Sequence, residues 1–197
     1  MHAAEHVLSY LHGTWNQMIQ YSRDSNENLN VLWGWVDVDW AGDTDTRRSH
    51  TGYILMMNAG PISEKSQHQN IVSLSTSEAE FVVAIQAGQE AIYLRETPID
   101  FGYSQTEATL LYENNLACIA MSENPVHRKF SCHFDIRQYF VCKLVLAGVL
   151  KLVALRARKM VADALTKSLP SLAIVGHQQV MTGHVPFATR LLRCFGG

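Results

Sequence analysis

The sequence predicts a mixed α/β domain whose sheet begins with antiparallel strands and ends with parallel ones. Three β-like runs precede the first long helix, at residues 31–40, 51–57 and 61–67, and their close succession indicates an antiparallel meander. After that helix, short strands at 109–112 and 149–155 are separated by helical segments, as parallel pairing requires. We therefore expect one sheet with both kinds of pairing, covered by helices.

The composition is that of a globular domain of ordinary size. The 197 residues are 47% hydrophobic, which is enough to form a core. The net charge of -2 provides no general basic field, so contact with nucleic acid would need a local patch. Four cysteines without paired short spacing argue against a disulfide framework or a zinc ribbon. With no signal peptide and no apolar run that could span a bilayer, we expect an intracellular protein without membrane contact.

The strand at 31–40 carries two carboxylates where a strand is expected to be apolar. Asp37 and Asp39 are two residues apart and therefore share one face of the strand. Strand interiors disfavour Asp, and a divalent cation held by carboxylate oxygens would explain the pair. A solvated edge strand would explain the pair without chemistry, and it is the more common case. Asp37 is therefore a candidate metal ligand, with an edge strand as the alternative.

The clearest helix spans 73–95, where apolar residues recur at intervals of three and four. We expect Ser77 to cap this helix and Pro98 to lie just beyond its end. Glu80 has two interpretations. In a capping box its carboxylate would bond back to the backbone of Ser77, whereas on the apolar side of the helix it would face the sheet. The sequence leaves both open.

The remaining helices are shorter. We expect an amphipathic helix at 3–18 ahead of the domain, and two helices at about 116–121 and 134–146. A last helix begins at about 160, with Asp163 in its first turn. An Asp in this position commonly serves only to stabilise the helix dipole, and a role in a site is the less common alternative.

Seven stretches of the sequence occur in the order of one known family. They are Asp37-Val38-Asp39-Trp40-Ala41-Gly42-Asp43, Arg47-Arg48-Ser49, Thr51-Gly52-Tyr53, Leu74-Ser75-Thr76-Ser77-Glu78-Ala79-Glu80-Phe81, Asn124-Pro125, His133-Phe134-Asp135-Ile136-Arg137 and Ala162-Asp163-Ala164-Leu165-Thr166-Lys167. In order and spacing, over residues 3–170, they resemble the RNase H domain of copia-type LTR retrotransposon polyproteins.

This resemblance implies an RNase H-like fold, with a central mixed five-stranded sheet flanked by helices, over residues 31–170. Residues 1–30 would then be an N-terminal helix and the connection to a lost reverse transcriptase, and 171–197 a C-terminal extension without assignment. The implied partners are an RNA/DNA hybrid and the reverse transcriptase portion of the same polyprotein. The implied place of action is a cytoplasmic particle or the nucleus.

The resemblance also implies an activity and its residues. The family hydrolyses the RNA strand of RNA/DNA hybrids with two Mg²⁺ ions, for which Mn²⁺ can substitute. Asp37, Glu80 and Asp163 match three of its four catalytic carboxylates and are the implied metal ligands. Two cations held in this way lower the pKa of an attacking water and stabilise the leaving oxygen.

The fourth position departs from the family. The family pattern has Asp after Tyr-Cys or Tyr-Glu, whereas this chain has Asn114 after Tyr112-Glu113. An amide has the shape of a carboxylate without its charge, so we expect a weakened metal site and a severe loss of catalysis in an intact fold. We do not expect Glu113 to substitute, because neighbouring strand residues face opposite sides.

Further departures favour a truncated, decaying copy of a transposable element. Cys132, Glu64 and Cys142 stand where the family commonly has a basic residue, Trp and Arg. Arg156, Arg158 and Lys159, next to Asp163, are the best candidates for phosphate contacts.

Two functional classes therefore remain. The first is an RNase H-type endonuclease, a phosphodiester hydrolase that Asn114 leaves weak or inactive. The second is a catalytically dead module that only binds nucleic acid or packs against a reverse transcriptase. A third, an unrelated α/β binding protein, would require a structure without the central sheet or with Asp37 and Glu80 far apart.

Overall fold

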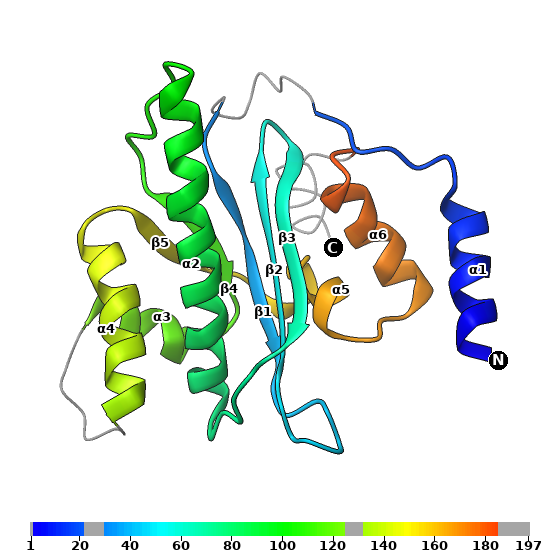
Figure 1. Ribbon diagram of the computed structural model, residues 1–197, viewed down its shortest axis with the longest axis horizontal. Coiled ribbons are helices and arrows are strands. Elements are labelled where there is room, and N and C mark those ends of the chain that lie inside the picture. The colour runs from blue at the N-terminus through cyan, green and yellow to red at the C-terminus, as the bar shows by residue number, and fades with distance from the viewer. Residues whose placement is uncertain (1, 22–29, 125–131, 185–197) are drawn as a thin grey trace.

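The computed structural model describes residues 2–21, 30–124 and 132–184, which fold around one central sheet (Figure 1). The strand order is β3-β2-β1-β4-β5. The strands are β1 (Trp33–Asp39), β2 (His50–Met57), β3 (Gly60–His68), β4 (Thr109–Glu113) and β5 (Leu150–Ala154). Strands β1 to β3 pair antiparallel, whereas β4 pairs parallel with both β1 and β5. The expected mixed sheet of five strands is confirmed, and β1 is a central strand rather than an edge.

Helices cover both faces of this sheet. They are α1 (His2–Thr14), α2 (Thr76–Asp100), α3 (Leu116–Glu123), α4 (Cys132–Leu146), the 3₁₀ helix η1 (Ala157–Lys159), α5 (Asp163–Thr166) and α6 (Ser171–Met181). Helix α2 lies across the sheet, with α3 and α4 beside it, while α5 and α6 lie on the other face (Figure 1). In the part of the chain that the structure describes, no helix is long and apolar enough to cross a membrane.

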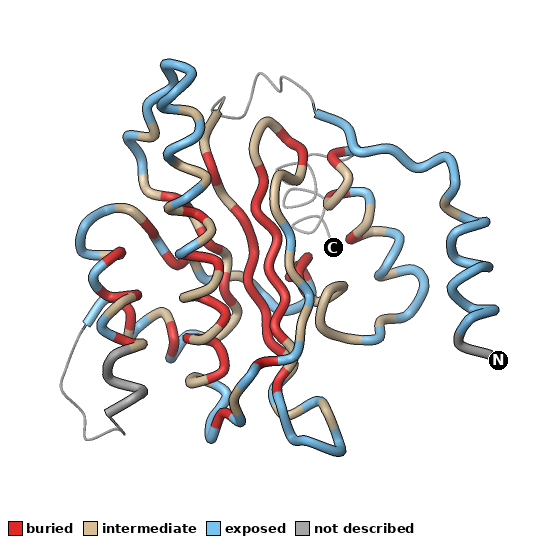
Figure 2. Tube along the Cα trace, in the orientation of Figure 1, coloured by how far each residue is buried: buried red, intermediate tan, exposed pale blue. Residues whose placement is uncertain are grey.

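Two hydrophobic clusters fill the spaces between these layers. The larger one packs Val36, Val38 and Leu111 of the sheet against Phe81 and other residues of α2. The smaller one, on the opposite face, surrounds the fully buried Trp35. Because side chains alternate along a strand, β1 contributes to both clusters. Buried residues accordingly run along the central strands, while residues 4–13 of α1 are exposed (Figure 2).

The ends of α2 differ from the sequence expectation. Ser75 is the N-cap, and its hydroxyl accepts a hydrogen bond from the backbone N–H of Glu78 at 3.1 Å. The expectation that Ser77 caps this helix was therefore wrong. The helix begins two residues earlier, and the side chain of Ser75 accepts the N–H of Glu78 in its first turn. Pro98 lies inside the helix rather than beyond it. A proline in the last turn removes only one backbone hydrogen bond, and its fixed φ is compatible with a helix.

The real stop signal of α2 is Gly102. Its φ is +86°, the left-handed region that glycine adopts without strain. The N–H of Gly102 donates to the carbonyl of Ile99 at 2.9 Å, and the N–H of Tyr103 donates to that of Pro98 at 2.8 Å. This pair of bonds is a Schellman motif, which satisfies the last carbonyl groups of the helix.

Candidate active site

The site is centred on Asp37, near the carboxyl end of β1. Its side chain is fully buried and accepts hydrogen bonds from residues of α5 and the position after it. The ammonium of Lys167 lies 3.1 Å from Oδ1 and 3.0 Å from Oδ2 of Asp37, and the hydroxyl of Thr166 donates to Oδ2. Lys167 also lies 2.7 Å from Oδ1 of Asp163, so one ammonium group bridges the two carboxylates.

A glycine allows α5 to approach the sheet at this point. Gly52 pairs with Asp37 across β1 and β2. A Cβ atom at this position would lie 2.6 Å from Cγ2 of Thr166 and 2.9 Å from Cβ of Leu165, both closer than side chains tolerate. The absence of a side chain at Gly52 therefore lets α5 reach Asp37. On the next strand, Ser66 donates a hydrogen bond to the carbonyl of Leu165 at 2.7 Å and fixes the same helix.

Glu80 enters the site from the first turns of α2. It is only 4% exposed and faces the sheet. The capping alternative does not hold, because Ser75 caps the helix and the carboxylate of Glu78 accepts the N–H of Leu74 at 2.7 Å. The buried amide of Gln69 holds this end of the helix, since it donates to the carbonyl of Ala79 at 3.0 Å.

Asn114 lies where its register with β1 places it. Trp35 pairs with Tyr112 in the parallel ladder, so Asp37 and Asn114, two residues further on, are neighbours. The amide Nδ2 of Asn114 donates a hydrogen bond to Oδ1 of Asp37 at 3.3 Å. Asn115 then caps α3, because its side-chain oxygen Oδ1 accepts the backbone N–H groups of Ala117 and Cys118. An uncharged amide thus lies beside the buried carboxylate of Asp37.

Glu113, the last residue of β4, lies next to Asn114 in the chain but on the other face of the sheet. It is fully buried at the end of β4, on the face opposite to Tyr112. The expected alternation along the strand holds, but this face is the one that Glu80 approaches from α2. The side chains of Glu113 and Glu80 are within hydrogen-bonding reach of each other. Glu113 therefore lies beside Glu80, on the opposite face of the sheet from Asn114. That it does not substitute for a carboxylate at position 114 stays a prediction.

The buried carboxyl groups hold protons more tightly than usual. Burial, followed by the charges of Glu113 and Asp37, raises the pKa of Glu80 well above its usual range. Burial raises the pKa of Glu113 to about 8 and that of Asp163 to about 6. Burial lowers the pKa of Lys167, but its hydrogen bond to Asp163 and the charge of Asp37 outweigh this effect and raise it. The site therefore carries more acidic groups than its single ammonium neutralises.

The donor set fits a divalent cation. Carboxylate oxygens are the ligands that Mg²⁺ prefers. Oε2 of Glu80 and Oε2 of Glu113 are buried and accept no hydrogen bond from any donor within the described ranges. On the other side of Asp37, Lys167 already holds a positive charge between two carboxylates. As they stand, the described residues contain no group of three or more His, Cys, Asp or Glu side chains that could hold a metal ion.

The other predicted residues lie around this centre. Arg156 and Arg158 are exposed, whereas Lys159 is only 6% exposed and offers little surface to a ligand. Glu78, two residues before Glu80 in α2, pairs with Arg137 at 3.3 Å. Cys142 is a buried free thiol whose Sγ lies 3.2 Å from the carbonyl oxygen of Met121. The side chain of Cys132 lies outside the described residues.

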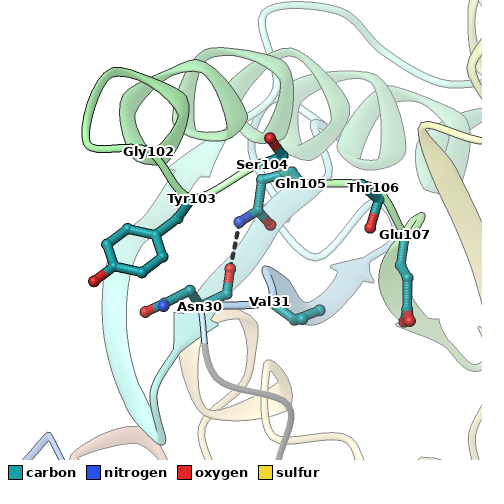
Figure 3. Close-up of a pocket in the computed structure, with 8 residues that line it drawn as sticks. All are labelled: Asn30, Val31, Gly102, Tyr103, Ser104, Gln105, Thr106 and Glu107. Atoms are coloured by element: carbon teal, nitrogen blue, oxygen red, sulfur yellow. Dashed lines mark hydrogen bonds between the residues drawn. The ribbon is translucent and has the colours of Figure 1, made fainter.

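A separate cavity of about 420 Å³ lies at the other end of the central strands. It is lined by Asn30, Val31 and the segment 102–107, where the side-chain amide of Gln105 donates to the carbonyl of Asn30 (Figure 3). These residues precede β1 and β4, whereas Asp37 and Asn114 lie near or beyond the carboxyl ends of these strands. The cavity is therefore not part of the carboxylate site.

Comparison with solved structures identifies the fold. LC11-RNase H1, isolated from compost by a metagenomic approach, superposes with a TM-score of 0.54 over 76% of this chain and 99% of its own, at 14% identity. The same protein in complex with an RNA/DNA hybrid gives a TM-score of 0.51 at 14% identity, over 68% of this chain and 93% of its own. The fold is thus that of an RNase H-like domain.

Comparison with known sequences identifies relatives of this chain among the polyproteins of plant transposons. The Pol polyprotein of transposon TNT 1-94 from Nicotiana tabacum is 33% identical over 168 residues, which is 85% of this chain and 12% of that protein. The Pol polyprotein of transposon RE1 from Arabidopsis thaliana is 30% identical over 169 residues, 86% of this chain and 11% of that protein. The chain is a homologue of a segment of the retrovirus-related Pol polyproteins of plant transposons. It spans about one eighth of their length. No protein-family model matches it.

Proposed function

We propose that this chain is the RNase H-type domain of a copia-like Pol polyprotein and hydrolyses the RNA strand of RNA/DNA hybrids, weakly. The observation that supports this most is the convergence of Asp37, Glu80 and Asp163, from three separate elements, near the carboxyl end of β1. These three side chains would hold two Mg²⁺ ions, or Mn²⁺ in their place. Ions of this kind lower the pKa of an attacking water and stabilise charge on the leaving oxygen.

Asn114 is the reason to propose weak activity. Its amide donates a hydrogen bond to Oδ1 of Asp37, an oxygen that Lys167 also contacts, and so competes with a cation for that oxygen. It also supplies no negative charge, and Mg²⁺ depends on carboxylates for most of its protein ligands. A decaying copy of a transposable element would account for this substitution. An intact upstream integrase and polymerase reading frame in the genomic flank would argue against decay.

The second candidate function is binding without cleavage. Arg156 and Arg158 are exposed on the segment that leads to Asp163 and would contact phosphates of a hybrid. Such a module would still bind nucleic acid or pack against the reverse transcriptase portion of its polyprotein. Exposed apolar side chains of the N-terminal segment support a protein partner; they include Leu8, Leu11, Trp15 and Met18. Either function would be exercised in a cytoplasmic particle or in the nucleus.

A cleavage assay tests the proposal. The chain is incubated with an RNA/DNA hybrid labelled on the RNA strand, in Mg²⁺ and in Mn²⁺, with single-stranded RNA and duplex DNA as comparison substrates. We expect slow cleavage of the RNA strand of the hybrid alone, and no cleavage by an Asp37→Asn variant. Cleavage that survives in Asp37→Asn would show that the activity comes from another site or from a contaminant. Hybrid binding without any cleavage would select the second candidate function.

A further inference from the structure

One row of residues crosses β1, β2 and β3 next to α5. Asp37 pairs with Gly52, and Gly52 pairs in turn with Ser66. A Cβ atom at Gly52 would lie 2.9 Å from Cβ of Leu165, and the hydroxyl of Ser66 donates to the carbonyl of Leu165 at 2.7 Å. The position of α5 over the sheet therefore depends on this row.

Helix α5 is too short to hold itself in place, since it has only four residues. A single helical turn is not stable alone, because its first hydrogen bond requires several residues to be fixed at once. This turn nevertheless carries Asp163, a proposed metal ligand, and Thr166, whose hydroxyl donates to Asp37. Contacts with the sheet must hold it, and the hydrogen bond from Ser66 is one of these contacts.

His50 lies in the next row on the same face of the sheet. It comes two residues before Gly52 on β2, so both positions face α5. Nε2 of its ring lies 2.9 Å from Oγ of Ser66. A serine hydroxyl has one proton, and Ser66 donates this proton to Leu165, so its oxygen accepts from the ring. The ring of His50 therefore carries a proton on Nε2 and donates it to Ser66.

The surroundings of this ring favour its neutral form. His50 packs edge-on against His68 of β3, with the ring centroids 4.7 Å apart. Burial, followed by the charge of His68, lowers the pKa of His50, although Asp39 at the paired position of β1 opposes this effect. A neutral ring has a single N–H, and hydrogen bonding decides which nitrogen carries it. The donor to Ser66 is thus the one N–H group of this ring.

We propose that His50 is a positioning residue that directs the hydroxyl of Ser66 toward α5 and thereby holds Asp163 beside Asp37. A hydroxyl proton rotates to suit its neighbours, and a donor on one side of the oxygen leaves the proton directed to the acceptor on the other. The role of His50 is indirect, because it acts through Ser66 and the carbonyl of Leu165. The effect on cleavage rests on the proposed function, whereas the link from the ring to α5 does not.

Hydrogen exchange of backbone amides in the full chain tests this link without metal or nucleic acid. The N–H groups of Leu165 and Lys167 donate to carbonyls at the start of α5, so their exchange reports its opening. We expect His50→Leu to speed this exchange about three- to tenfold, the factor that one net hydrogen bond commonly contributes. His50→Gln should restore slow exchange, because its amide is again a donor. The control His12→Leu removes an exposed histidine from α1 and should change nothing.

A double variant separates a specific link from general destabilisation. Ser66→Ala removes the acceptor of the ring, so adding His50→Leu to it should change α5 exchange by less than twofold. The amides of α3, on the other face of the sheet, should exchange equally in all variants. Exchange of α5 within twofold of the unmodified chain in folded His50→Leu, or equal acceleration in His50→Gln, would overturn the proposal.

A measurement on the unmodified chain decides the matter if His50→Leu does not fold. NMR of the ring nitrogens at neutral pH shows which of them carries the proton. A proton on Nε2 of His50 supports the proposal, and a neutral ring with its proton on Nδ1 overturns it.

The cleavage assay then tests whether the position of α5 matters to the reaction. On the labelled hybrid, we expect His50→Leu to lower kcat about three- to tenfold with little change in KM, and His50→Gln to retain kcat. An unchanged kcat in a folded His50→Leu would overturn the role of His50 in positioning the site. Faster α5 exchange in His50→Leu, in a chain that never cleaves hybrid, would support the link and count against the proposed function alone.

Discussion

The ammonium nitrogen of Lys167 lies 3.0 Å from Oδ2 and 3.1 Å from Oδ1 of Asp37, the buried carboxylate at the centre of the site. It also lies 2.7 Å from Oδ1 of Asp163, so the positive charge sits between two proposed metal ligands. The protein's own cation thus satisfies, in this arrangement, the negative charge that a divalent ion would satisfy when bound. A metal that uses both carboxylates has to compete with Lys167 for them.

Removal of this ammonium provides the first prediction. In Lys167→Gln, Asp37 and Asp163 face each other without a cation, and we expect the free energy of unfolding without metal to fall by about 1–2 kcal/mol. Saturating Mg²⁺ should restore it, and the apparent Mg²⁺ affinity should rise because no ammonium competes. Urea unfolding with EDTA and with Mg²⁺ measures both effects. The exposed Lys151→Gln is the control, and equal stabilisation of both variants by Mg²⁺ would contradict this competition.

The second prediction concerns the approach of α5 to the sheet. In Gly52→Ala, the new methyl group would meet Thr166 and Leu165 at 2.6 and 2.9 Å, so α5 has to shift away from Asp37. We expect a loss of about 1–3 kcal/mol in the free energy of unfolding, as for other overpacked sites, together with weaker Mn²⁺ binding. The control is Gly13→Ala, whose Cβ meets nothing within 4 Å. An unchanged Mn²⁺ affinity in Gly52→Ala would mean that the position of α5 does not govern the site.

The third prediction is a dependence of stability on pH. Burial raises the pKa of Glu113 from 4.5 to about 8, in an environment that it shares with Glu80, Asp37 and Cys118. The folded protein therefore binds more protons than the unfolded chain between these two values. Stability without metal should fall as pH rises from 5 to 8, by up to about 1.4 kcal/mol per pH unit for this proton.

Urea unfolding at pH 5.5, 6.5 and 7.5 with EDTA measures this slope. The slope should be smaller in Glu113→Gln, because its side chain does not titrate. Burial also raises the pKa of Glu80 and, to about 6, that of Asp163, so part of the fall remains in that variant. A stability that rises with pH in the unmodified chain, or an equal slope in both proteins, would refute this assignment.

Much of the fold follows from local patterns in the sequence. The three early strands and α2 are visible because apolar and β-branched residues repeat with the period of each element. Strand β1 also identifies Asp37, because a carboxylate in an otherwise apolar strand requires a partner. The ends of α2 were less predictable, since Ser75 and Ser77 offer the same chemistry and tertiary packing decides between them. Gly102 marks the end of α2 better than Pro98 does, but Pro98 comes first in the sequence and was taken as the residue that ends the helix.

The site was only partly predictable for a different reason. Asp37, Glu80 and Asp163 followed from the family pattern, and the structure brings these three near one another. Glu113 and Lys167 were missed because their roles depend on long-range neighbours rather than on their own segments. Strand alternation correctly placed Glu113 on the opposite face from Asn114, but it does not reveal that α2 brings Glu80 to that face. One feature of the sequence could have indicated the position of Lys167. It follows Asp163 by four residues, a spacing that favours an ion pair on a helix.

The most direct test of the central claim is the effect of Asn114→Asp on hybrid cleavage. The unmodified chain and the variant are compared on the same labelled RNA/DNA hybrid in Mg²⁺, after circular dichroism has shown that both are folded. Because Asp adds a negative charge beside Asp37, we predict that the variant cleaves the RNA strand about 10–100-fold faster. Comparable cleavage by the unmodified chain in Mg²⁺ would contradict the conclusion that Asn114 impairs this site.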